Sequence, residues 1–228
     1  MTDKEINYCN ELGTQLAHRA CLELSNLIDQ TTQQGQWYKY DIGGKNLHRG
    51  WYCPSIIYDI VIGNASRGRL VKKPQPQTLP SFRYCFNANG TLLRVDEYFN
   101  GKIAASESLL YENETIKGLT ITSDNQLLRY SEEQYSDAIL TQYSYIDYNP
   151  CDKTPYFLHC EKYKLEDNRL ICWFAEYEMM TKSGWSHNYI FTLDEQGVIQ
   201  SYHIEGEDPK GIDHSERVVS RNRNISRN

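Results

Sequence analysis

Cysteine, histidine and carboxylate side chains are the groups in this sequence whose types can carry catalysis. A cysteine nucleophile, Cys53 or Cys160, would need a base such as His187, and the two can lie far apart in sequence. Activation requires a thiol pKa lowered by a helix N-terminus or a neighbouring cation, and few helix N-termini are expected here. A hydrolase that uses Asp96, His187 and Cys160 therefore depends on these three side chains converging.

The histidines and glycines form no metal or nucleotide motif. No two histidines lie on one helical face, and neither His-x-His nor His-Glu-x-x-His occurs. His159 and Cys160 are adjacent, so on a strand they point to opposite faces and cannot share an ion. Gly43-Gly44 lacks the Gly-x-x-x-x-Gly-Lys spacing of a phosphate-binding loop. We therefore expect no catalytic residues, no cofactor and no bound metal.

Paired acids occur at Asp96-Glu97 and Glu132-Glu133. Glycoside hydrolysis needs two carboxyl groups facing each other across a cleft, whereas adjacent residues of a strand face opposite ways. We expect these acids to be solvated on strand faces, where they also discourage pairing between sheet edges. The basic cluster at residues 67–69, followed by two lysines, is expected to form internal ion pairs.

Tyrosines interleaved with acids are the best candidates for a binding surface. Tyrosine is enriched at binding hot spots, and neighbouring acids attract a basic partner. The alternative is that these rings simply cover a wide sheet. The candidate partner-binding residues are Tyr98, Tyr111, Tyr130, Tyr135, Tyr143, Tyr145, Glu97, Glu112, Glu132, Glu133 and Asp137.

One long amphipathic helix is predicted at residues 3–30, because apolar residues recur there at three- and four-residue steps. Thr2 and Glu5 fit a capping box at its start. Residues 31–80 are predicted to be irregular, with a buried strand at 55–62 because that run is rich in isoleucine.

Turn signals about a dozen residues apart predict a β-meander between residues 82 and 204. The expected strands are 82–86, 92–98, 106–111, 116–122, 127–130, 139–148, 158–165, 170–179, 188–193 and 198–204. Asn-Gly, Asp-Asn and related pairs separate them because these residues tolerate the positive φ of tight hairpins. The last expected turn signals are Ser183-Gly184 and Gln196-Gly197.

The predicted fold class is mainly β: an antiparallel meander, a twisted open or partly closed sheet, with one N-terminal amphipathic α-helix. Residues 1–216 are expected to form a single domain. Residues 217–228 hold four arginines and no acid, and are expected to form a basic flexible tail.

Composition and charge narrow the functional classes. The chain has 228 residues and a net charge of −6, and without the +4 tail the body carries −10. An acidic body disfavours nucleic acid and favours a basic protein partner or simple solubility. Seven scattered cysteines without a signal peptide are expected to be reduced and mostly buried, which favours a cytoplasmic location. No stretch is apolar enough for a membrane span.

Residues 66–73 read Ser-Arg-Gly-Arg-Leu-Val-Lys-Lys, and residues 84–98 read Tyr-Cys-Phe-Asn-Ala-Asn-Gly-Thr-Leu-Leu-Arg-Val-Asp-Glu-Tyr. Residues 110–120 and 191–202 repeat the second pattern. This pattern resembles the YD-type β-hairpin repeats of bacterial Rhs proteins. It is also similar to small proteins encoded beside polymorphic toxins and proposed as their immunity partners. The chain is too short to form the large encapsulating shell of Rhs proteins, so the resemblance implies the partner role.

The sequence therefore predicts a non-catalytic cytosolic interaction protein, an immunity protein that binds and neutralises a cognate toxin domain. Two alternatives stay open. One is a β-barrel carrier of a small molecule or lipid, and the other is the hydrolase with dispersed site residues described above.

Overall fold

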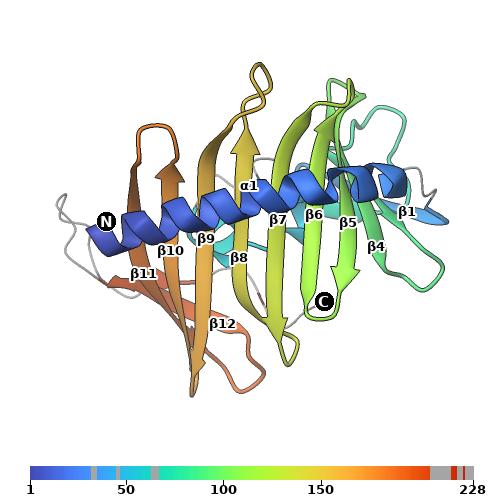
Figure 1. Cartoon of the computed structure of the whole chain (residues 1–228). Helices are drawn as coiled ribbons and strands as arrows, with labels where there is room; N and C mark the ends of the chain where they lie inside the picture. The colour runs from blue at the N-terminus through green and yellow to red at the C-terminus, as the bar shows by residue number, and fades with distance from the viewer. Residues whose placement is uncertain (32–34, 45–46, 63–66, 206–216, 220–222, 224–228) are drawn as a thin grey trace.

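The computed structural model describes residues 1–31, 35–44, 47–62, 67–205, 217–219 and 223. One antiparallel sheet of thirteen strands follows the order β13-β12-β11-β10-β9-β8-β7-β6-β5-β4-β3-β1-β2, and helix α1 crosses one of its faces (Figure 1). The strands are β1 Trp37–Ile42, β2 Arg69–Val71, β3 Phe82–Phe86, β4 Leu92–Phe99, β5 Lys102–Glu112, β6 Thr115–Thr122, β7 Leu127–Ser136, β8 Ile139–Tyr148, β9 Pro155–Glu166, β10 Arg169–Glu178, β11 Ser183–Leu193, β12 Ile199–Glu205 and β13 Arg217–Val218. The predicted antiparallel meander with one N-terminal helix is confirmed.

Helix α1, Asp3–Thr31, begins at the predicted capping box. The Glu5 amide N–H donates to Thr2 Oγ1 at 3.3 Å, and the Thr2 N–H donates to Glu5 Oε2 at 2.6 Å. The apolar stripe of the helix is buried against the outer face of the sheet, and it includes Cys9, Leu12, Leu16 and Ala20. The apolar face of the amphipathic helix therefore packs on the sheet, and such packing provides most of the stability of a helix in a protein.

The hairpin turns of the meander lie at the predicted positions, with one exception. Asn100, Asn113, Asn125 and Asp167 have φ between 46° and 62°, in the left-handed region that these residue types tolerate. The exception is the turn expected at Ser183-Gly184. The chain turns at residues 179–182 instead, and residues 183 and 184 already belong to β11.

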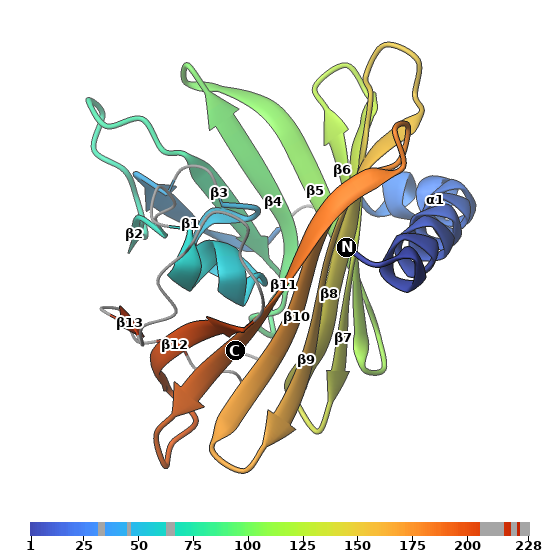
Figure 2. The same ribbon diagram turned by 90° about the vertical axis from the view of Figure 1, so that its left-hand side faces the viewer.

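The strand predicted at residues 55–62 is wrong. Residues 57–61 form a single π-helical turn, Ile57–Val61, after a short 3₁₀ turn at Gly50–Tyr52. We call residues 47–62 the plug, because they lie within the curve of the sheet, on the inner face opposite α1 (Figure 2). The helical turn lets the consecutive residues Ile56 and Ile57 both pack into the core of the inner face. A strand would point one of the two away from that core.

The described part of the expected flexible tail belongs to the fold. Ser201 and Tyr202 of β12 pair with the two residues of β13. The Ile199 N–H donates to the Arg223 carbonyl at 2.9 Å, and the Arg223 guanidinium donates to the carbonyls of Cys53 and Pro54 at 3.1 and 3.2 Å. The segment therefore ties the plug to one end of the sheet. Residues 220–222 and 224–228 lie outside the described residues.

All seven cysteines are free thiols and five of them are buried, as predicted. Among the described residues, no helix has a stretch long and apolar enough to cross a membrane.

Candidate functional site

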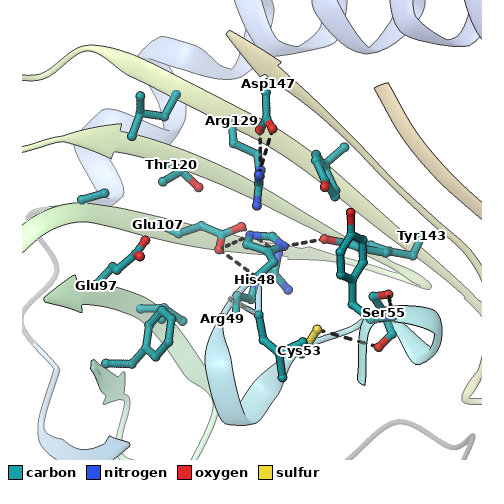
Figure 3. A pocket seen from close by; sticks show the side chains of 17 residues that line it. His48, Arg49, Cys53, Ser55, Glu97, Glu107, Thr120, Arg129, Tyr143 and Asp147 are labelled. Atoms are coloured by element: carbon teal, nitrogen blue, oxygen red, sulfur yellow. Dashed lines mark hydrogen bonds and ion pairs between the residues drawn. The ribbon is translucent and has the colours of Figure 1, made fainter. Parts of the chain in front are cut away.

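A pocket of about 360 Å³ lies between the plug and the inner face of the sheet (Figure 3). Its walls combine apolar and aromatic side chains with a small number of polar groups that point inward, which is the usual composition of a ligand site. The polar and charged lining residues include His48, Arg49, Ser55, Glu97, Glu107, Thr120, Arg129, Tyr143 and Asp147.

Strand register brings four of these residues into one row. Glu107 of β5 is opposite Thr120 of β6, Thr120 is opposite Arg129 of β7, and Arg129 is opposite Asp147 of β8. Side chains directly opposite each other in antiparallel strands share a face. The meander therefore builds a polar row across four strands from residues that are spread over 40 positions of the sequence, from Glu107 to Asp147.

Arg49 anchors the plug to this row. Its Nε and a terminal nitrogen donate to the two oxygens of Glu107 at 2.9 and 2.8 Å, and it also binds Glu133 and, at 3.0 Å, the Ser131 hydroxyl. Arg49 is 4% exposed. Gly118 makes this approach possible, because a Cβ there would lie 2.0 Å from Glu107 Oε1 and 2.6 Å from the Arg49 guanidinium.

The buried side chains of Glu107 and Arg49 keep each other ionised. Burial alone would raise the pKa of Glu107, but the charge of Arg49 and the hydrogen bonds from His48 and Arg49 hold it well below its usual range. Burial likewise opposes the charge of Arg49, and Glu107 and Glu133 nevertheless raise the pKa of Arg49 above its usual value. The two groups therefore stay charged only because each compensates the other.

His48 is neutral near pH 7, because burial lowers its pKa to about 4. Its Nε2 lies 2.8 Å from Glu107 Oε2, and its Nδ1 lies 2.5 Å from the Tyr143 hydroxyl. The ionised carboxylate can only accept, so Nε2 carries the proton and Nδ1 accepts from Tyr143. Hydroxyl, imidazole and carboxylate follow the order of a nucleophilic triad. The Tyr143 side chain is fully buried, however, and burial raises its pKa well above the usual value.

The other side of the pocket holds a second cation and two groups without partners. Arg129 donates to both oxygens of Asp147, at 2.6 and 3.0 Å, and its guanidinium lies 4.0 Å from the centre of the Tyr145 ring. Glu97 makes no hydrogen bond or ion pair within the part of the chain that the structure describes. The residue as a whole is exposed, but the pocket walls partly desolvate its carboxylate, which raises its pKa. The Oγ1 atom of Thr120 is buried without a hydrogen-bond partner.

The predicted partner-binding residues do not share one face. Tyr130 and Glu132 point to the outer face, where they are buried beneath α1 and Arg19 binds Glu132 at 2.6 Å. The Tyr143 and Tyr145 rings are buried at the inner face. Alternation along the strands separates the set, since neighbouring residues point to opposite sides.

The remaining members of that set are divided as follows. Glu133 and Glu97 lie at the inner face, the first bound to Arg49 and the second in the pocket, and Tyr111 and Tyr135 line a second pocket there. Tyr98 is half-buried on β4, Glu112 is exposed and bound to Lys117, and Asp137 is exposed in the β7–β8 turn.

The paired acids point to opposite faces as predicted, but the expectation that they are solvated is wrong for three of the four. Asp96, Glu132 and Glu133 are 1%, 5% and 4% exposed, and each binds an arginine. A buried carboxylate needs such a partner to stay charged. The internal role expected for residues 67–69 is confirmed at Arg67, which binds Asp59 at 2.7 Å.

The residues of the hydrolase alternative do not converge. Cys160 is buried beneath α1 at the outer face, whereas His187 lies against Trp185 and Tyr189 at the inner face. Asp96 is on β4, and four strands lie between β4 and β9. Burial raises the pKa of the Cys53 thiol, which is the opposite of activation.

Sequence reasoning did not identify His48, Arg49, Glu107, Thr120 or Arg129. A signal for Glu107 exists, because it shares a strand face with the buried residues Ala105 and Leu109 and so occupies a core position. Comparison of the chain with protein-family models, with curated proteins and with solved structures found no match.

Proposed function

We propose that this protein is a non-catalytic interaction protein of the immunity type, which binds a basic bacterial toxin domain in the cytoplasm and blocks its active surface. The observation that supports this proposal is an acidic rim on strands β8, β10 and β11 of the inner face. We define this rim as Asp147, Glu176 and Glu178, together with Trp185, which is 41% exposed.

Strand register places the rim residues near one another. Glu178 and Asp147 flank Phe157, which is opposite both of them, and Trp185 is opposite Glu176. A partly exposed tryptophan opposite Glu176 combines a typical hot-spot residue with a charge that attracts a basic surface. The net charge of −6 would steer such a partner in the same direction.

The plug supports the same proposal from inside the fold. Its ion pairs with the sheet hold the inner face in one arrangement, with most ionisable groups bound to each other. A rigid surface loses little conformational entropy on binding, so more of the contact energy appears as affinity.

The test is complex formation with the toxin domain encoded beside the gene, combined with protection of cells against that toxin. We expect Trp185→Ala to weaken the complex by about thirtyfold, the value for loss of a hot spot of about 2 kcal/mol. Glu178→Lys should slow association and weaken its dependence on salt. Glu195→Lys is the matched control, because Glu195 is an exposed acid in the turn before β12. Absence of both a complex and protection would refute the proposal.

A second candidate function, carriage of a small molecule, is favoured by a larger pocket of about 710 Å³ on the inner face. Its walls are rich in aromatic rings, among them Trp37, Trp51 and Tyr111. The sheet is open, with β13 and β2 at its two ends, so a carrier of this kind would hold its ligand in a cleft. Mass spectrometry of the protein isolated from its own cells under native conditions, and again after denaturation, tests this candidate.

A further inference from the structure

The pocket of about 360 Å³ carries one uncompensated negative charge. Its lining includes three carboxylates, of which Glu107 is bound to Arg49 and Asp147 to Arg129. Glu97 has neither an ion pair nor a hydrogen bond among the described residues. Because His48 is neutral, the lining carries two positive charges and three negative ones.

An unused hydrogen-bonding group lies on the same side of the pocket. Thr120 Oγ1 is buried and has no hydrogen-bond partner among the residues that the structure describes, and a buried hydroxyl in that state costs free energy. Figure 3 shows Glu97 and Thr120 on one side of the pocket, on the strands that flank β5. On β5, between these two strands, Ala105 is opposite Glu97 and Glu107 is opposite Thr120, and both line the pocket.

We propose that this pocket binds one organic cation, an alkylguanidinium or alkylammonium group, with Glu97 as its counter-ion and Thr120 as a hydrogen-bond acceptor. The cation neutralises the carboxylate of Glu97, an exposed residue at the pocket, and donates an N–H to the buried Thr120 hydroxyl oxygen, which gains its missing partner. Phe82, Val95 and Leu128 offer an apolar wall for the alkyl part. An anion would bring a further negative charge beside Glu97 and is disfavoured.

The same chemistry has two sources: a free small molecule, or a lysine or arginine side chain inserted by a protein partner. The proposal goes beyond the proposed function and does not depend on it, because the pocket binds the group in either case. The raised pKa of Glu97 agrees with this chemistry, since a bound cation favours the ionised carboxylate and should lower that pKa. Affinity should therefore increase with pH until Glu97 is ionised.

The test is titration of the full chain with n-butylguanidinium, n-butylammonium and neutral n-butylurea, followed through backbone amide NMR signals. We expect saturable shifts at the pocket with the two cations and none with n-butylurea. Glu97→Gln should weaken binding of both cations at least tenfold, as expected for loss of a charged hydrogen-bond partner. Glu195→Gln, the exposed control, should bind them like the wild type.

Thr120→Val separates a binding role from a structural one. It removes a buried hydroxyl that has no partner, so the thermal stability of the chain should stay unchanged or increase, while affinity for n-butylguanidinium falls severalfold. The proposal is overturned if neither cation binds the folded wild type, if n-butylurea binds equally well, or if Glu97→Gln binds like Glu195→Gln.

Two further measurements identify the source of the cation. Displacement of n-butylguanidinium by the toxin domain supports a side chain of the partner. A small cation that is released on denaturing wild-type protein from its own cells, and is missing from Glu97→Gln, supports a free molecule. If the toxin domain binds without displacing n-butylguanidinium, the proposed function stands and the pocket serves a separate ligand.

Discussion

Lowering the pH should destabilise the protein through His48, the imidazole that joins the plug to β5 and β8. The folded protein keeps His48 neutral down to about pH 4, whereas the unfolded chain binds that proton near the ordinary pKa of 6.5. Between these two values the unfolded state holds more protons, so the free energy of unfolding decreases as the pH falls through this window. Above pH 6.5 both states are neutral at this position and the contribution is constant.

The size of the effect follows from the pKa difference. At about 1.4 kcal/mol for each pKa unit, the shift from 6.5 to about 4 corresponds to a loss of about 3 kcal/mol between pH 7 and pH 4. This is a large fraction of the 5–15 kcal/mol that ordinarily separates folded and unfolded states. The side chain is only 10% exposed, so solvent screens it little. Charges facing it from the packed elements are Glu107, Arg49 and Arg129, and the neutral Tyr143 hydroxyl completes its surroundings.

Urea denaturation at several pH values between 4 and 8 measures this loss. His48→Gln keeps a donor for Glu107 and an acceptor for Tyr143 but does not titrate. The variant should therefore lose about 3 kcal/mol less than the wild type across the window. His18→Gln is the control, because His18 is exposed on α1. If wild type and His48→Gln lose stability in parallel, the neutral buried imidazole is not the source of the pH dependence and the reasoning is refuted.

Two other substitutions test the packing of the plug. Arg49→Met leaves Glu107 and Glu133 buried without their cation, so it should reduce the free energy of unfolding by about 3–5 kcal/mol in the same urea assay. Adding Glu107→Gln and Glu133→Gln to this variant removes the two buried charges and should restore part of the loss. Gly118→Ala forces a methyl group against Glu107 and Arg49 and should reduce the free energy of unfolding, measured by thermal denaturation, by about 1–3 kcal/mol. Gly13→Ala in α1 is the control, because its new Cβ meets only the flexible end of a methionine, and it should raise the free energy of unfolding by up to about 1 kcal/mol. Equal effects of the two alanines would contradict the close approach of Arg49 and Glu107 to Gly118.

The sequence was sufficient to predict the helix and the meander because both depend on local periodicity. The three- and four-residue spacing of Leu12, Leu16 and Ala20 requires one apolar face, and the structure buries that face against the sheet. Asparagine and aspartate turns, such as those at Asn100, Asn113 and Asp167, mark where the flanking strands end, since these residue types accept a positive φ more readily than most. Each of these features is decided within about a dozen residues.

The plug was assigned wrongly because its conformation is decided by distant strands. β-Branched residues favour strands only where a pleated, half-buried surface is available to them. Residues 55–62 pack instead onto the inner face, where the Ser55 hydroxyl accepts the Tyr58 N–H and also binds Glu161 of β9. Glu161, the partner of Ser55, is 106 positions away in the sequence, so this contact cannot be predicted from the residues near Ser55.

The site residues were missed for a related reason. Glu107 and Arg129 occupy core positions of their strands, and the sequence alone does not say what lies opposite them. Only the register of the sheet aligns Glu107, Thr120 and Arg129, and only the plug brings Arg49 to that row. The candidate binding tyrosines were identified by type, but type does not determine which face of a strand a residue occupies.

The charged residues of the inner face serve two separate purposes: most of them fix the position of the plug, and Glu97 is available to bind a ligand. Burying an arginine between two carboxylates is rarely more stabilising than an apolar core of the same volume, so the Arg49 cluster is better explained by the single position that it enforces on the plug. That requirement accounts for Arg49, Glu107 and Glu133. It does not account for Glu97, which makes no hydrogen bond or ion pair among the described residues and lies in the pocket between the plug and the sheet. A carboxylate without a structural partner, at a site that the rest of the fold keeps rigid, is where recognition of a positively charged group is best sought.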